Sequence, residues 1–278
     1  MKKKTPIVVA ALCAAVLLLG GCSAVEGVKQ ATRQDPVVTD SAFLYDEETG
    51  VYKTVAVIRN DTPYSFSLGF VLPEALDADG NKMEQQKDNE GLEPGQVDIG
   101  YALLYYWLCP GETTAVMDTN ENLVAAGLDS ELSTYFDTVP ASLEWTAKPD
   151  YATRDPQLEP HGISVVSCEA GEDPYAEFNE DEYGRYEVTL RNDSENTYVF
   201  NPGECRYYAG DKPFSFDVIA VYRDAEGAIR DAEKLYLVFE DTEPDLAPGS
   251  ENKLIFESDH VVDDDSLTPE YYISPFDF

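Results

Sequence analysis

The stretch Tyr186–Ser194, YEVTLRNDS, decides the fold. Tyr186, Val188 and Leu190 alternate with polar residues, which is the period of a β-strand with one buried face. The strand leads into Asn192-Asp193-Ser194, whose side chains favour a turn because they bond to the nearby backbone. The segment therefore predicts a short β-strand that ends in a polar turn.

The same strand and turn occur earlier in the chain, and two further motifs repeat in the same order. Ala56–Thr62 (AVIRNDT) matches Val188–Ser194 (VTLRNDS). Val71-Leu72 before Asp77-Ala78-Asp79-Gly80 matches Val218-Ile219 before Asp224-Ala225-Glu226-Gly227, and Leu108-Cys109-Pro110-Gly111-Glu112 matches Leu246-Ala247-Pro248-Gly249-Ser250. Asp-x-x-Gly and Pro-Gly are typical of tight turns. Three matches in register, separated by loops of different length, indicate duplicated domains.

Short strands separated by turn signals dominate both halves, which predicts an all-β fold of two β-sandwich domains in tandem. We expect domain 1 at residues 38–148, a Pro-rich linker at residues 149–162 and domain 2 at residues 163–278. A short helical insert is expected within Asn120–Phe136 of the first domain, because its apolar residues have helical spacing. These residues are Leu123, Leu128, Leu132 and Phe136.

The order of the repeated motifs resembles the immunoglobulin-like domains of bacterial lipoproteins. These include the FxLYD type and related domains of unknown function. The resemblance covers most of both halves, and the helical insert departs from it. It implies two immunoglobulin-like β-sandwiches that act as an extracytoplasmic interaction or spacer module. It brings no shared catalytic residues.

The N-terminal residues carry an export signal. Lys2, Lys3 and Lys4 precede the apolar run Ile7–Leu19, which has the length of a signal-peptide core and is too short to span a bilayer. Leu19-Gly20-Gly21-Cys22 then resembles the lipobox of bacterial lipoproteins. The resemblance implies a signal peptide at residues 1–21, cleavage between Gly21 and Cys22, and an acyl chain such as palmitate on Cys22. Residues 22–37 would be a flexible tether. The alternative is an ordinary secretory signal or an uncleaved anchor with a coincidental cysteine.

The chain is strongly acidic, with 54 Asp and Glu against 19 Lys and Arg and a formal charge of −35. Removing residues 1–21 takes away three lysines and no acidic residue, so the mature charge is −38. This charge argues against nucleic acid and against a basic membrane-binding patch. A solvated acidic surface is expected, with a polycation- or calcium-binding role as the alternative.

Three cysteines remain in the mature chain besides Cys22, namely Cys109, Cys168 and Cys205. An odd number allows at most one internal disulfide. Cys168 and Cys205 are the candidate pair because they lie in the same half. Buried free thiols are the default expectation.

No catalytic, cofactor-binding or metal-binding site is recognisable in the sequence. His161 and His260 stand outside any nucleophile motif and are expected to be solvated. The acidic segments 77–81, 180–182 and 263–265 are expected to be turns and loops rather than calcium sites. The tyrosines are expected to fill cores, with a carbohydrate- or peptide-binding platform as the alternative. The residues concerned are Tyr101, Tyr105, Tyr106, Trp107, Tyr207, Tyr208, Tyr236, Tyr271 and Tyr272.

The sequence therefore predicts a lipoprotein held at the cell membrane on the extracytoplasmic face by acyl chains on Cys22. It would act as a binding or spacer module and not as an enzyme. Its partner would be another envelope protein, a cell-wall polymer or a host molecule. The alternative is an envelope enzyme or transport accessory that uses the acidic loops for metal or carbohydrate chemistry.

Overall fold

The computed structural model describes residues 35–46, 52–83, 106–120, 140–150, 160–171, 184–238, 243–258, 261–262 and 264–276. Every regular element within these ranges is a β-strand, which confirms the all-β prediction. We call residues 35–150 the first half and residues 160–276 the second half. The signal peptide, the lipobox and most of the tether lie outside the described residues, as does the predicted helical insert except for Asn120, which ends β5.

Fourteen strands are described, and all their ladders are antiparallel. The first half contains β1 (Val37–Tyr45), β2 (Tyr52–Arg59), β3 (Phe66–Leu76), β4 (Tyr106–Leu108), β5 (Thr113–Asn120) and β6 (Ser142–Asp150). The second half contains β7 (Ile163–Ala170), β8 (Gly184–Asn192), β9 (Tyr198–Asn201), β10 (Arg206–Ala209), β11 (Lys212–Arg223), β12 (Ile229–Leu237), β13 (Glu251–Ser258) and β14 (Thr268–Phe276).

The pairing of the first half recurs in the second. β2 lies between β1 and β5, as β8 lies between β7 and β13. β3 pairs with β6, as β11 pairs with β14. Each half thus combines a three-stranded unit with a second unit built on a long central strand. In the second half, β10 also pairs with β11 and forms a hairpin with β9. The described strands of the first half include no counterpart of this hairpin.

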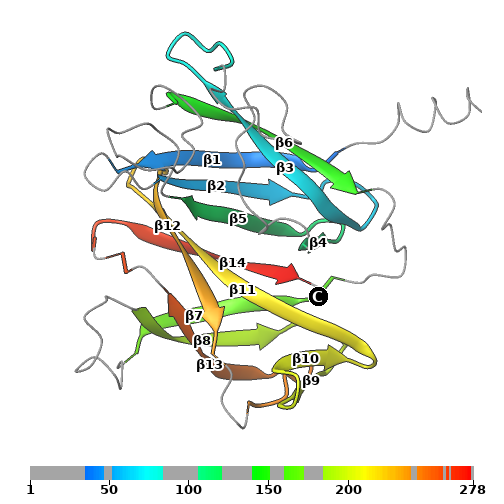
Figure 1. Cartoon of the computed structure of the whole chain (residues 1–278). Coiled ribbons are helices and arrows are strands. Elements are labelled where there is room, and N and C mark those ends of the chain that lie inside the picture. The colour runs from blue at the N-terminus through cyan, green and yellow to red at the C-terminus, as the bar shows by residue number, and fades with distance from the viewer. Residues whose placement is uncertain are drawn as a thin grey trace, which may run out of the picture. The chain divides into compact units, whose positions relative to one another are not determined.

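The two halves share a sheet as well as a pattern. One eleven-stranded sheet runs β6-β3-β4-β14-β11-β12-β13-β8-β7, with β10 and then β9 branching from β11. It crosses between the halves where Phe276 of β14 pairs with Tyr106 of β4. Figure 1 shows the separate sheet of β1, β2 and β5 between β3 and β6 on one side and β11 and β14 on the other.

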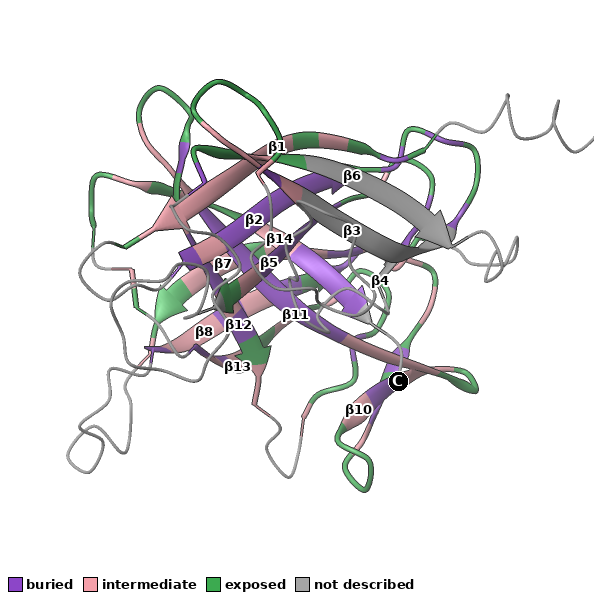
Figure 2. Cartoon of the chain, turned by 45° about the horizontal axis from the view of Figure 1, so that its top comes forward, coloured by how far each residue is buried: buried purple, intermediate pink, exposed green. Residues whose placement is uncertain are grey.

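The central strands are buried on both faces, as the purple colour of β2 and β11 in Figure 2 shows. In β2, Val55 and Val57 point to one side and Ala56 and Ile58 to the other, and all four are 4% exposed or less. A strand buried on both faces lies between two packed layers.

One apolar core lies between the halves, and we call it the seam. It joins β2 and β5 of the first half to β11 and β12 of the second. Its buried members are Val55, Val57, Ala115, Met117, Ile219, Val221, Ile229 and Ala232. Burying this surface stabilises the contact by roughly 25 cal/mol for each Å² of apolar area removed from water. The seam therefore fixes the two halves against each other.

A second core fills the interior of the second half and is rich in aromatic rings. Phe216 of β11 packs against Phe214, Tyr207 and Phe256, with ring centroids 5.4 to 6.3 Å apart. Tyr198 stacks against Phe214 at 4.5 Å. These are the usual separations of packed aromatic pairs.

The repeated Asn-Asp turn has the same hydrogen bonds in both halves. Asn60 is fully buried; its Nδ2 donates to the carbonyl oxygens of Tyr64 (2.7 Å) and Leu108 (3.0 Å). Its Oδ1 accepts from the backbone N–H of Thr62 (2.9 Å) and from the Thr62 hydroxyl (2.7 Å). The backbone oxygen of Asn60 accepts from Gly111, at 2.8 Å.

The copy in the second half is centred on Asn192, which is 1% exposed. Its Nδ2 donates to the carbonyl oxygens of Asn196 (2.7 Å) and Leu246 (2.8 Å), and its Oδ1 accepts from Ser194 N–H (2.9 Å) and Ser194 Oγ (2.7 Å). Its backbone oxygen accepts from Gly249 at 2.7 Å. In each half, one buried asparagine thus joins its turn to the Pro-Gly turn.

The Asp-x-x-Gly hairpins also match. The Asp77 carboxylate accepts the backbone N–H groups of Asp79 (2.9 Å) and Asn81 (2.8 Å). The Asp224 carboxylate accepts those of Glu226 (3.1 Å) and Ala228 (2.8 Å). Gly80 and Gly227 close the turns at φ of 81° and 87°, a region that favours glycine.

The structure bears less directly on the domain boundaries. β1 begins at Val37. β6 continues to Asp150, so β6 includes residues 149 and 150, the first two of the predicted linker. Residues 151–159 lie outside the described residues. The antiparallel sheets agree with a β-sandwich, whereas the immunoglobulin-like topology and the tandem arrangement stay predictions.

Candidate functional site

The predicted lipidation and cleavage residues, Cys22 and Gly21, lie outside the described residues. Cys109, Cys168 and Cys205 are free thiols, so the candidate bridge between Cys168 and Cys205 is not formed. Cys168 is half-buried on β7 beside the second-half core, whereas Cys205 is exposed in the β9–β10 turn.

The acidic segments that the structure describes are turns, as predicted. The Asp77 carboxylate is occupied by backbone N–H groups, which hold its pKa below the usual value. Asp264 accepts from the Ser266 N–H (2.9 Å) and hydroxyl (2.6 Å). Residues 180–182 and Asp263 lie outside the described residues. Within the described ranges, no three His, Cys, Asp or Glu side chains are grouped closely enough to hold a metal ion.

His161 corrects the expectation of a solvated linker histidine. Its side chain is 15% exposed, and its Nε2 lies 3.3 Å from the Glu112 carboxylate of the first half. Its Nδ1 accepts the Ile163 N–H at 3.0 Å, so the neutral ring carries its proton on Nε2. Burial lowers the pKa of His161, and the Glu112 charge opposes that shift. No sequence pattern predicts this contact, because His161 and Glu112 are 49 residues apart in the chain. His260 lies outside the described residues.

The described tyrosines favour the core interpretation over an exposed platform. Tyr207 is 1% exposed and belongs to the second-half core. Tyr271 and Tyr272 are half-buried against the second-half core and the seam, respectively. Tyr236 and Tyr64 are 42% and 47% exposed, and the Tyr208 hydroxyl bonds to Glu204 at the surface. The side chains of Tyr101, Tyr105, Tyr106 and Trp107 are outside the described part of the molecule.

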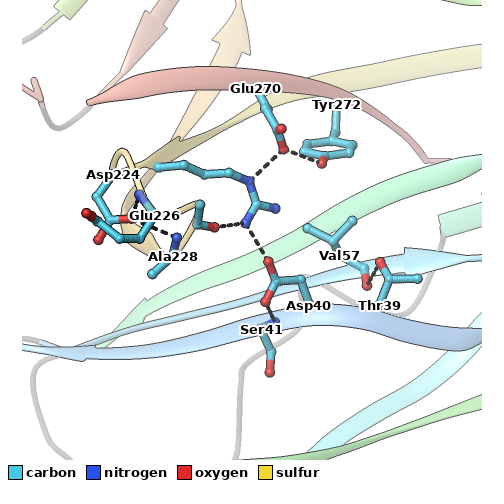
Figure 3. Close-up of polar contacts among 11 residues, drawn as sticks. Thr39, Asp40, Ser41, Val57, Asp224, Glu226, Ala228, Glu270 and Tyr272 are labelled. Atoms are coloured by element: carbon cyan, nitrogen blue, oxygen red, sulfur yellow. Dashed lines mark hydrogen bonds and ion pairs between the residues drawn. The ribbon is translucent and has the colours of Figure 1, made fainter. Parts of the chain in front are cut away.

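Arg223 is the main polar contact between the halves. Its side chain is 15% exposed and binds the Asp40 carboxylate of β1, while its Nε donates to Glu270 Oε2 at 2.7 Å. The same Glu270 oxygen accepts from the Tyr272 hydroxyl at 2.9 Å (Figure 3). Two carboxylates beside the guanidinium outweigh its burial and raise the pKa of Arg223. A paired guanidinium at the edge of the seam therefore fixes β1 against β11 and β14.

Further polar contacts lie around the same seam. Lys53 of β2 binds the Asp231 carboxylate at 2.6 Å and the Ala232 carbonyl oxygen at 3.2 Å. The buried Thr114 hydroxyl donates to the Ile273 carbonyl at 2.9 Å. The buried Ser274 hydroxyl donates to the carbonyl of Ala115, at 3.1 Å. These four side chains thus have polar partners, as is usual for buried polar groups.

A second polar cluster lies inside the second half, and we call it the Glu233 cluster. It consists of Glu233 on β12 with side chains from four other strands: Cys168 (β7), Tyr186 (β8), Tyr222 (β11) and Tyr271 (β14). Glu233 is 1% exposed, whereas the other four are half-buried. The Tyr222 hydroxyl donates to Glu233 Oε2 at 2.7 Å. The Tyr186 hydroxyl also interacts with this carboxylate, and the Tyr271 hydroxyl interacts with the Cys168 thiol.

The environment of this cluster strongly favours protonated phenols and a protonated thiol. Burial raises the pKa of Tyr222 and Tyr186, and the Glu233 carboxylate raises both further. Burial also raises the pKa of Cys168, to about 11. A group of perturbed, converging side chains is a functional-site signal of the kind that sequence patterns do not carry. The spacing of these residues in the chain follows no motif.

No protein-family model matches the chain, and no curated protein matches it. No helix in the described ranges is long and apolar enough to cross a membrane.

Proposed function

We propose that this chain is a lipoprotein anchored by Cys22 to the extracytoplasmic face of the cell membrane. It would present two duplicated immunoglobulin-like domains to an envelope protein, a cell-wall polymer or a host molecule, or hold them as a spacer. The lipobox Leu19–Cys22 supports the anchor. The matching Asn60 and Asn192 turns support the duplication, because the same side-chain bonds recur in the same order of strands.

The seam is the observation that carries this proposal. Val57 and Val221 are 4% and 0% exposed between the halves, and Arg223 and Lys53 form ion pairs beside them. Two domains on a loose linker would expose this apolar surface to water. A fixed pair suits a module that must hold a binding surface at a set distance from its anchor. A partner would meet loops or the edge strands β1 and β7, whose outer edges pair with no other described strand.

Metabolic labelling of cells with a palmitate analogue tests the anchor. Wild-type protein should incorporate label and stay with the membrane fraction. Cys22→Ala should lose the label and leave the membrane fraction. Cys13→Ala is the matched control, since Cys13 is removed with the signal peptide and its loss should leave labelling unchanged. Unchanged labelling of the Cys22→Ala protein would reject the anchor.

A second experiment separates a binding module from a spacer. Crosslinking on intact cells should give a discrete adduct with the anchored chain if the module binds a partner at the membrane. The same cells with the Cys22→Ala chain should lose that adduct. A spacer would give no discrete adduct in either strain.

A further inference from the structure

The proposed display role leaves the Glu233 cluster without a purpose. A carboxylate that is 1% exposed needs its charge balanced, because burying an unpaired ion is strongly unfavourable. Yet within the described residues no lysine, arginine or histidine pairs with Glu233, and its contacts are with hydroxyls. Its Oε1 atom accepts no hydrogen bond of normal geometry there.

One oxygen pair of the cluster, joined by an ordinary hydrogen bond, has the spacing that two neighbouring ligands of one ion would have. Tyr222 Oη and Glu233 Oε2 are 2.7 Å apart. Neighbouring oxygens around a small octahedral cation, each about 2 Å from the metal, lie about 2.8 Å from one another. The Tyr186 hydroxyl interacts with the same carboxylate. Tyr271 lies close enough to Tyr186 and Tyr222 to raise the pKa of both.

We propose that Glu233, Tyr186 and Tyr222, with Tyr271 beside them, form a binding site for ferric ion. One carboxylate and two phenolates carry three negative charges, which balance a trivalent cation inside the protein. Each coordinated phenol releases one proton to solvent as its Fe–O bond forms, and the iron stays ferric throughout. Binding thus releases two protons per ion.

The same ligand set disfavours other common metals. Calcium takes six to eight oxygens and is a weak Lewis acid, so it does not readily displace the proton of a phenol. Zinc prefers thiolate and imidazole ligands, and Cys168 is the one such side chain in the cluster. The oxygen ligands of the cluster therefore suit a strong Lewis acid that favours oxygen, such as ferric ion.

Titration of the full chain, purified in detergent, with ferric citrate tests this site. Phenolate bound to ferric ion absorbs visible light by charge transfer, whereas iron on surface carboxylates does not. We expect one equivalent of iron to produce this band. Occupancy should increase as pH rises, because protons are released on binding. Tyr222→Phe, which keeps the ring, should weaken binding at least tenfold, and Glu233→Gln should do the same.

Tyr208→Phe is the matched control. Tyr208 also bonds to a glutamate, Glu204, but that pair is exposed on β10 and its turn. The band should survive in Tyr208→Phe and in Cys168→Ser. No band in the wild type, or a band unchanged in Tyr222→Phe, would overturn the proposal. Loss of binding in Cys168→Ser alone would assign a soft-metal site instead. Circular dichroism of each variant confirms that it folds. The Cys22→Ala chain should bind iron normally, so the site is tested separately from the anchor.

Discussion

Replacing Asn192 with alanine should remove the link between the two turns of the second half. The amide makes four hydrogen bonds, two to the carbonyl oxygens of Asn196 and Leu246 and two from Ser194. Each such bond contributes roughly 1 kcal/mol net, and buried carbonyls left without a partner add to the loss. We therefore expect the free energy of unfolding to fall by about 3 kcal/mol.

Urea unfolding followed by far-ultraviolet circular dichroism measures this loss from the midpoint and slope of the transition. Arg191→Ala is the neighbouring control. Its side chain is 47% exposed and pairs with Asp193, so its loss should cost less than about 1 kcal/mol. Equal losses in the two variants would refute the structural role of the buried amide. Asn60→Ala should behave as Asn192→Ala does, because its hydrogen bonds are the same.

Three further predictions concern the seam, the thiols and pH. Val221→Ala should lower the free energy of unfolding by roughly 2 kcal/mol, and calorimetry should still show one transition because both halves share this core. At pH 8 the exposed Cys205 should alkylate readily. Cys168 should alkylate slowly, because its pKa of about 11 gives it a roughly hundredfold smaller thiolate fraction than an ordinary thiol has. Peptide mapping by mass spectrometry measures the alkylation rate of each cysteine. Burial lowers the pKa of His161 in the folded chain, whereas in the unfolded chain it is about 6.5. At pH values just below 6.5, the folded chain therefore binds fewer protons than the unfolded chain. Stability should therefore fall as pH drops through that window, and His161→Gln should lose this part of the pH dependence in parallel urea titrations.

The turns could be predicted from the sequence because their geometry is local. Asp77 and Gly80 form their hairpin within five residues, and Asn192 and Ser194 make their contact across two. Side-chain bonds over such short spans depend on residue type alone. The alternation of Tyr186, Val188 and Leu190 also predicted a strand where the structure has β8.

Alternation does not predict the seam, although the sequence carries one signal for it. Val55, Ala56, Val57 and Ile58 form an uninterrupted apolar run, which is typical of a strand buried on both faces. Alternation in the YEVTLRNDS segment drew the prediction toward half-buried strands. The ion pairs beside the seam carry no such signal, because Arg223 and Asp40 are 183 residues apart.

The Glu233 cluster could not be found from the sequence at all. Its members come from five strands, and each is an ordinary residue of a strand when taken alone. Glu233 lies between Ala232 and Lys234 in β12, where alternation gives no reason to expect full burial. Only the packing of β7 and β8 against β11, β12 and β14 brings the hydroxyls to one carboxylate.

A distance between the halves tests most directly whether they form one body. Spin labels can be placed at two exposed positions in the repeated hairpins, through Asp79→Cys and Glu226→Cys in a Cys205→Ser chain. Double electron–electron resonance then measures the distance between the two spin labels. We expect a single narrow distance distribution, because the seam and the Arg223 ion pairs hold the hairpins in place. A broad or multiple distribution would mean that the two domains move independently, and it would contradict a rigid pair.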